Sequence, residues 1–211
     1  MKVNSISLKL VYLMLILTAG FLLVGYLVTK PAVLLVDQQL SEMIYNLSGH
    51  RVIDQFFLIV TDLGSSKLAF PLLALLAAYF LYKRQFYFVF LLFFNVVGVR
   101  SLNWVLKTIY ARERPLVEHL ADAGYYSFPS GHSMHTMAFF GFIAYLLWVY
   151  GRGFGRPAIH LYVLWIFVFI ILVGFSRVYL GVHFVFDVIG GFFAGAAWSV
   201  LCIILLRFGR R

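Results

Sequence analysis

Charged residues are scarce in this chain of 211 residues, and cysteine is almost absent. Only 12% of the residues are charged, whereas 63% are hydrophobic, a balance that excludes an ordinary soluble domain and is typical of an integral membrane protein. The single cysteine, Cys202, can form no intrachain disulfide, and its place in an apolar run makes it a lipid-facing or packing residue. The net charge of +9 does not indicate nucleic acid, because the basic residues flank apolar runs and form no polar stripe.

Six apolar runs are long enough to cross a bilayer, which requires about 20 apolar residues per helix. They cover residues 8–28, 66–83, 86–109, 133–150, 158–176 and 184–207. The first run lacks a clear small-residue cleavage site, so we expect a retained helix and no cleaved signal peptide. The sequence therefore predicts an all-α integral membrane protein with six transmembrane helices. No repeat, low-complexity tract or linker divides it, so we expect one membrane-embedded domain over residues 1–211.

The region 31–64 has a different pattern. Its first half has apolar residues at helical spacing, from Val33 to Leu47, with Asp37 and other polar residues opposite them. Its second half, residues 52–63, is too short to span a bilayer and carries Asp54 and Asp62. We expect one or two interfacial helices here, lying along the membrane surface. A re-entrant or loop segment is the alternative.

Charge differs between the two ends of the expected helices. Nine basic residues and no acid lie at the ends assigned to one side: Lys2, Lys9, Lys83, Arg84, Arg152, Arg156, Arg207, Arg210 and Arg211. All eight acidic residues fall on the other side or at its helix ends. Because cytoplasmic loops carry the excess of Lys and Arg, this asymmetry predicts that both termini are cytoplasmic. The polar clusters described next would then face the extracytoplasmic side.

The first polar cluster, residues 107–115, follows the third apolar run. Lys107 shares one face of that helix with Arg100 and Asn103, so we expect it to point toward the group that Arg114 holds. Pro115 favours an extended backbone after Arg114. Cations that snorkel to lipid headgroups are the alternative interpretation. Arg112 and Glu113, inside this cluster, could shape a pocket or form a surface ion pair.

The second cluster is Pro129-Ser130-Gly131-His132, directly before the fourth apolar run. Free backbone amides and the positive end of a helix dipole at this place would form a cradle for a phosphate. Gly131 leaves room for an anion to approach the backbone. Taken alone, the segment is also ordinary turn chemistry, and His132 could be a simple cap. His135, one turn later, is a candidate for a supporting position.

The third cluster runs from Ser176 to Asp187. His183 and Asp187 are four residues apart, so the carboxylate can hold one imidazole nitrogen and make the other more nucleophilic. Arg177 offers a planar fork of donors to phosphate oxygens. A buried His–Asp pair with a purely structural role is the alternative. Small residues between Gly190 and Ala197 predict close packing of the last helix.

Together the clusters resemble the type 2 phosphatidic acid phosphatases, also called lipid phosphate phosphatases. The signature of that family is Lys-x6-Arg-Pro, then Pro-Ser-Gly-His, then Ser-Arg-x5-His-x3-Asp. The matching residues are Lys107, Arg114-Pro115, Pro129 to His132, Ser176-Arg177, His183 and Asp187. The small size and simple loops look most like bacterial members that process phosphatidylglycerophosphate or undecaprenyl pyrophosphate.

The resemblance implies a role for each matching residue. His183 would attack phosphorus to give a phosphohistidine, Asp187 would orient it, and His132 would act as general acid and base. The phosphate would be held by Lys107, Arg114, Arg177 and the backbone near Ser130 and Gly131. We expect no metal, because the sequence has no clustered carboxylates at metal-ligand spacing and three cations can neutralise the phosphate. We expect no cofactor, no nucleic acid and no obligate protein partner.

The sequence thus predicts a multi-pass phosphatase of the cell membrane that hydrolyses a lipid phosphate at the extracytoplasmic face. Phosphatidylglycerophosphate is the favoured substrate, ahead of undecaprenyl pyrophosphate and phosphatidic acid. Two alternatives remain open at this stage. One is a phosphotransferase that passes the phosphoryl group to an acceptor, and the other is a non-enzymatic lipid transporter or scaffold.

Overall fold

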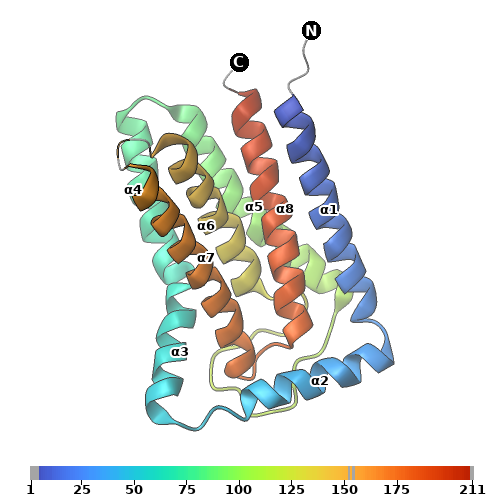
Figure 1. Cartoon of the computed structure of the whole chain (residues 1–211). Helices are drawn as coiled ribbons and strands as arrows, with labels where there is room; N and C mark the ends of the chain where they lie inside the picture. The colour runs from blue at the N-terminus through green and yellow to red at the C-terminus, as the bar shows by residue number, and fades with distance from the viewer. Residues whose placement is uncertain (1–4, 152, 154, 210–211) are drawn as a thin grey trace.

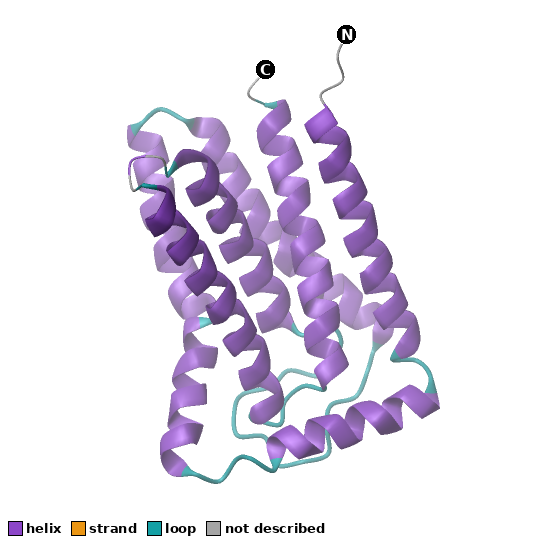
Figure 2. Ribbon diagram, viewed as in Figure 1, coloured by secondary structure: helices purple, strands orange, loops and turns teal. Residues whose placement is uncertain are grey.

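The computed structural model describes residues 5–151, 153 and 155–209, and in these residues the secondary structure is entirely helical (Figures 1 and 2). Four of the basic residues used for the orientation argument (Lys2, Arg152, Arg210 and Arg211) lie outside the described residues. The helices are α1 (Ser5–Leu27), α2 (Pro31–Tyr45), α3 (Arg51–Leu63), α4 (Ser66–Tyr82), α5 (Phe86–Tyr110), α6 (Gly131–Tyr150), α7 (Arg156–Tyr179) and α8 (Val185–Phe208).

Six helical segments are long and apolar enough to cross a membrane. They are Leu8–Leu27, Arg51–Tyr82, Phe86–Tyr110, Gly131–Tyr150, Arg156–Tyr179 and Val185–Phe208. In Figure 1 these segments run side by side as a bundle, with both ends of the described chain at one end of the bundle and α2 lying across the other. The prediction of an all-α membrane protein with six spans is confirmed, and α2 has the orientation expected of an interfacial helix.

Helix α3 differs from the expectation that it would lie along the membrane surface. It continues α4 nearly end to end (Figure 1), so that the two form one 32-residue apolar segment. Of the two acidic residues that indicated contact with water, Asp54 instead meets α7, where it accepts a hydrogen bond of 2.7 Å from the Tyr179 hydroxyl. Asp62 stays exposed and pairs with Lys67 at 2.6 Å. At about 1.5 Å per residue the segment is about 48 Å long, which exceeds a hydrocarbon core of about 30 Å. Part of α3 therefore extends beyond the hydrocarbon.

Close packing between α6 and α8 brings two distant parts of the chain together, as the small residues of α8 predicted. A Cβ atom added at Gly191 would lie 2.7 Å from the carbonyl oxygen of Ser130, and one at Gly195 would collide with the carbonyl of Met134. The backbone N–H of Ser130 donates to the carbonyl of Asp187 over 2.9 Å. The start of α6 is therefore fixed against the first turn of α8.

The long loop between α5 and α6 folds back under the bundle. Helix α5 ends at Ala111, which has φ 45° and so adopts a left-handed conformation that costs a non-glycine residue about 1–2 kcal/mol. After this turn the loop is tied to itself, since Ser127 donates from its backbone N–H to Arg112 (2.8 Å) and from its hydroxyl to Glu113 (2.8 Å). The loop thereby carries the first polar cluster back toward the start of α6.

Candidate active site

His183 and Asp187 form the pair that their spacing predicts. His183 lies in the short turn between α7 and α8 and is 2% exposed, while Asp187, in the first turn of α8, is fully buried. The Nδ1 atom of His183 is 3.3 Å from Oδ2 of Asp187. The same carboxylate oxygen accepts the backbone N–H of Phe184 at 2.9 Å. The imidazole is therefore oriented with its other nitrogen, Nε2, directed away from Asp187.

Two of the predicted cations come together beside that nitrogen. The Nη1 atom of Arg114 lies 3.5 Å from Nε2 of His183 and donates to the carbonyl of Val182. Lys107 donates to the backbone carbonyl of Tyr126, which also accepts from Arg114 Nη2 at 3.0 Å. Lys107 and Arg114 thus converge on one point, as the first cluster predicted. The aromatic ring of Tyr126 is not needed for this, because its backbone carbonyl is the acceptor.

Arg177 is the third cation, and it is almost completely buried. Its Nη1 atom donates to Thr61 Oγ1 in α3 at 2.6 Å, and its Nη2 atom donates to the carbonyl of Asp122 at 3.2 Å. The Nε atom is buried and has no hydrogen-bond partner. Because a guanidinium has five N–H donors, Arg177 retains a donor for a further acceptor.

The surroundings of His183 keep its ring neutral. Burial is the largest cause that lowers the pKa of His183 well below its ordinary value, followed by the positive charges of Arg114, Lys107 and Arg177. Burial also lowers the pKa of Arg114, and the charge of Asp187 opposes that shift. A neutral imidazole whose Nδ1–H is held by a carboxylate has a free lone pair on Nε2. That is the state which a histidine nucleophile needs.

The second cluster begins α6. Ser130 is fully buried and precedes the helix, and the first intrahelical hydrogen bond runs from the N–H of Met134 to the carbonyl of Ser130 (3.0 Å). The amides of Gly131, His132 and the next residue therefore have no intrahelical acceptor, and they point out from the positive end of the helix dipole. The half-buried His132 lies close enough to Arg177 and His183 to interact with both electrostatically.

Arg112 has a role that the sequence did not reveal. Of the two alternatives left open for Arg112, a surface ion pair is excluded, because its side chain is only 8% exposed and bridges two fully buried carboxylates. Nη1 donates to Oδ1 of Asp187 at 2.6 Å, and Nη2 donates to Oδ2 of Asp37 at 2.8 Å. The guanidinium also lies 4.3 Å from the ring of Phe184. Arg112 therefore holds the carboxylate that orients His183.

Asp37 is the second residue that the sequence missed. It belongs to α2, where its position on the polar face indicated contact with water, yet it is fully buried. Its Oδ1 atom accepts the backbone N–H of Phe186 at 3.1 Å. Burial raises the pKa of Asp37, and the charge of Arg112 is the main effect that opposes this. No motif could have found the pair, since Asp37 and Arg112 are 75 residues apart.

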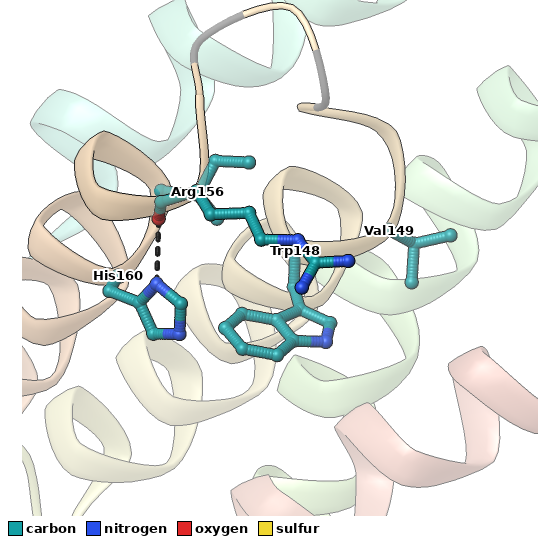
Figure 3. Close-up of a pocket in the computed structure, with 5 residues that line it drawn as sticks. Trp148, Val149, Arg156 and His160 are labelled. Atoms are coloured by element: carbon teal, nitrogen blue, oxygen red, sulfur yellow. Dashed lines mark hydrogen bonds between the residues drawn. The ribbon is translucent and has the colours of Figure 1, made fainter.

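A large cavity lies far from these residues. It has a volume of about 690 Å³ and lies between the end of α6 and the start of α7, where it is lined by Trp148, Val149, Arg156, Ile159 and His160 (Figure 3). A smaller cavity of about 140 Å³ borders His183 and the polar face of α2. Among the described residues, no group of three or more His, Cys, Asp or Glu side chains could hold a metal ion.

Comparison with known proteins agrees with this arrangement. The sequence model of the PAP2 superfamily matches residues 86–211 of this chain. Phosphatidylglycerophosphatase B of Bacillus subtilis is 38% identical over 136 residues, which cover 64% of this chain and 66% of that protein. An undecaprenyl-diphosphatase of the same organism is 27% identical over 165 residues, covering 73% of this chain and 76% of that protein.

A solved structure shares the fold as well. The crystal structure of the PAP2-type phosphatidylglycerolphosphate phosphatase from Bacillus subtilis superposes with a TM-score of 0.85 and 32% identity. The match covers 93% of this chain and 97% of that one. The chain therefore belongs to the PAP2 superfamily, as a multi-pass member with the fold of membrane lipid phosphatases.

Proposed function

We propose that this membrane lipid phosphatase removes a terminal phosphate from its substrate through a phosphohistidine intermediate on His183. The observation that carries the proposal is the buried, neutral His183, which is held by Asp187 on one nitrogen and faces Arg114 with the other. A phosphate placed beside Nε2 would lie among the three cations whose charges act on His183. These charges would stabilise the negative charge that spreads over the equatorial oxygens in the transition state.

The reaction would proceed in two steps. In the first, Nε2 of His183 attacks phosphorus, the bond to the lipid oxygen breaks, and His132 gives its proton to that oxygen. In the second, the oxygen of a water molecule attacks phosphorus while His132 accepts a proton from that water, the bond from phosphorus to Nε2 of His183 breaks, and inorganic phosphate leaves. Lys107, Arg114, Arg177 and the free backbone amides that begin at Gly131 would hold the phosphate throughout, whereas the amide of Ser130 already donates to the carbonyl of Asp187. No step requires a metal, because the cations supply the charge neutralisation.

Phosphatidylglycerophosphate is the substrate that we propose, ahead of undecaprenyl pyrophosphate and phosphatidic acid. The activities for which the Bacillus subtilis relatives are named support the first two. The site lies at the end of the bundle opposite the termini (Figure 1). Lys9, Lys83, Arg84, Arg156 and Arg207 lie at the end with the termini, and no described acidic residue lies there. Because cytoplasmic ends carry an excess of basic residues, we propose that the site faces the extracytoplasmic side of the cell membrane.

The test is a phosphate-release assay in detergent with a chelator present. It compares phosphatidylglycerophosphate, undecaprenyl pyrophosphate, phosphatidic acid and lysophosphatidic acid, and it follows any transfer of phosphate to an added alcohol. A substrate labelled with ³²P, quenched in alkali, should leave label on the protein. His183→Gln should abolish that label and lower phosphate release by about 10⁴-fold or more, since no nucleophile remains. Release of phosphate from none of the lipids, or full labelling of His183→Gln, would refute the proposal.

A further inference from the structure

Arg100 is a cation inside a membrane-spanning helix, and the proposed reaction does not use it. It lies ten residues before the end of α5, which corresponds to a depth of about 15 Å at 1.5 Å per residue. No described carboxylate forms an ion pair with it within 4 Å. Its contacts are one hydrogen bond of 2.6 Å from Nη2 to Ser66 Oγ and the ring of Phe70 at 4.9 Å. An ionisable residue at such a depth usually has a function.

Two side-chain nitrogen atoms around Arg100 are buried and have no hydrogen-bond partner. They are Nε of Arg100 and Nε2 of His135, and each buried polar atom without a partner costs about 1–3 kcal/mol. Both residues line one small cavity, together with Ser65 and Thr136. The cavity has a volume of about 10 Å³, enough for about one water molecule. A larger anion therefore has to replace the Ser66 hydroxyl at Arg100.

The cavity lies about one helical turn from the start of α6, because His135 is among its lining residues. A Cβ atom added at Gly131 would lie 3.7 Å from Cε1 of His135, so the His135 ring lies on the same side of α6 as Gly131, one turn further along the helix. The charge of Arg100 acts on both His132 and His135. Along α5, Arg100 is about 10 Å deeper in the bundle than Lys107, since seven residues separate them.

We propose that Arg100 and His135 form a second anion subsite, which binds a phosphate carried by the leaving group of the lipid. Phosphatidylglycerophosphate has such a phosphate, separated from the terminal one by glycerol, and a polyprenyl diphosphate has one directly adjacent. Phosphatidic acid has none. Arg100 exchanges its neutral partner Ser66 for phosphate oxygens, and charge-assisted hydrogen bonds of this kind are about twice as strong as neutral ones. The subsite rests on the proposed function and specifies its substrate class.

The depth of the two cations agrees with the order of groups along such a lipid. The terminal phosphate lies nearest the membrane surface, among Lys107, Arg114 and Arg177. The ester oxygen follows, within reach of His132. The second phosphate lies deeper, at Arg100 and His135, and the tails continue into the bilayer.

The experiment measures kcat/KM in mixed micelles for phosphatidylglycerophosphate, a polyprenyl diphosphate and phosphatidic acid. Arg100→Gln should lower kcat/KM for the two lipids with a second phosphate at least 10-fold more than for phosphatidic acid. Arg100→Lys, which keeps the charge but loses the fork of donors, should retain part of the preference. The matched control is Ser66→Ala, which removes the present partner and keeps the cation, and it should leave the preference intact. A larger effect on phosphatidylglycerophosphate than on the diphosphate would show that the subsite matches the glycerol spacing.

A second measurement on the unchanged protein does not depend on the folding of any variant. Phosphatidylglycerol has the phosphodiester of the leaving group, so it should inhibit phosphatidic acid hydrolysis more strongly than diacylglycerol does. Equal inhibition by the two, or an equal loss of all three activities in Arg100→Gln, would overturn the subsite and leave the proposed function standing. Failure of the unchanged protein to hydrolyse any of the lipids would overturn both.

Discussion

Replacing Arg112 by Met should show how strongly the catalytic pair depends on a residue outside the reaction. The substitution keeps an unbranched side chain of about the length of the aliphatic part of arginine and removes the charge that joins Asp37 to Asp187. Two fully buried carboxylates then lose their ion-pair partner, and breaking one buried pair in this way costs about 3–5 kcal/mol. We expect a clear fall in thermal stability in detergent.

Activity should fall for a separate reason. The bond from Arg112 to Oδ1 of Asp187 is charge-assisted and 2.6 Å long, and hydrogen bonds to charged groups contribute about 1.5–3 kcal/mol. If that free energy is lost in the transition state, where Asp187 must hold the imidazole of His183, kcat should fall about 10- to 100-fold. KM, measured by varying the concentration of the lipid substrate, should change much less, because Arg112 is not among the residues that we expect to hold the phosphate.

A double-mutant cycle separates these effects from general damage. Asp37→Asn alone should destabilise the protein, since it removes one partner of Arg112. In the Arg112→Met background the same change should stabilise it, because it neutralises one of the two orphaned carboxylates. Additive losses in the double mutant, or unchanged kcat in Arg112→Met at a temperature where the protein is folded, would refute the reasoning.

Three further outcomes follow from the site and its orientation. Because the pKa of His183 is lowered, its ring stays neutral as the pH falls through about 6.5. The fall of kcat/KM at acid pH that reflects protonation of His183 should therefore occur well below that pH. In Arg114→Gln it should occur at a higher pH, because one of the positive charges that lower this pKa is removed. A membrane-impermeant maleimide should label Tyr125→Cys in intact cells but Lys83→Cys only after permeabilisation, with little background from the buried Cys202. EDTA should leave phosphate release unchanged, whereas vanadate should inhibit it.

The general plan of the molecule could be predicted from the sequence because membrane helices have a strong local signal. A run of about 20 apolar residues has few alternatives in a bilayer. Residues at the same ends of successive helices must then meet at one face, which brings Lys107, His132 and His183 together without knowledge of the packing. The pair of His183 and Asp187 depends only on a spacing of four residues, so it too could be predicted.

Helix α3 could not be placed correctly from the sequence, because two of its polar residues have partners far away in the chain. Asp54 and Thr61 lie on the face that packs on α7, where they meet Tyr179 and Arg177 at 2.7 and 2.6 Å. A polar face that binds another helix has the same sequence pattern as one that faces water. Only the tertiary contacts distinguish the two cases, because the periodicity of the sequence is the same in both.

The same reasoning changes the role of α2, which is more than a membrane-surface helix. The first amides of α8 have no intrahelical acceptors, and two side chains of α2 supply them. Ser41 Oγ accepts the N–H of Val185 at 3.1 Å, and Asp37 Oδ1 accepts that of Phe186 at 3.1 Å. The next residue of α8 is Asp187. Since α2 caps the turn that carries this carboxylate and also holds Arg112, any displacement of α2 in the membrane surface must displace the group that orients the nucleophile.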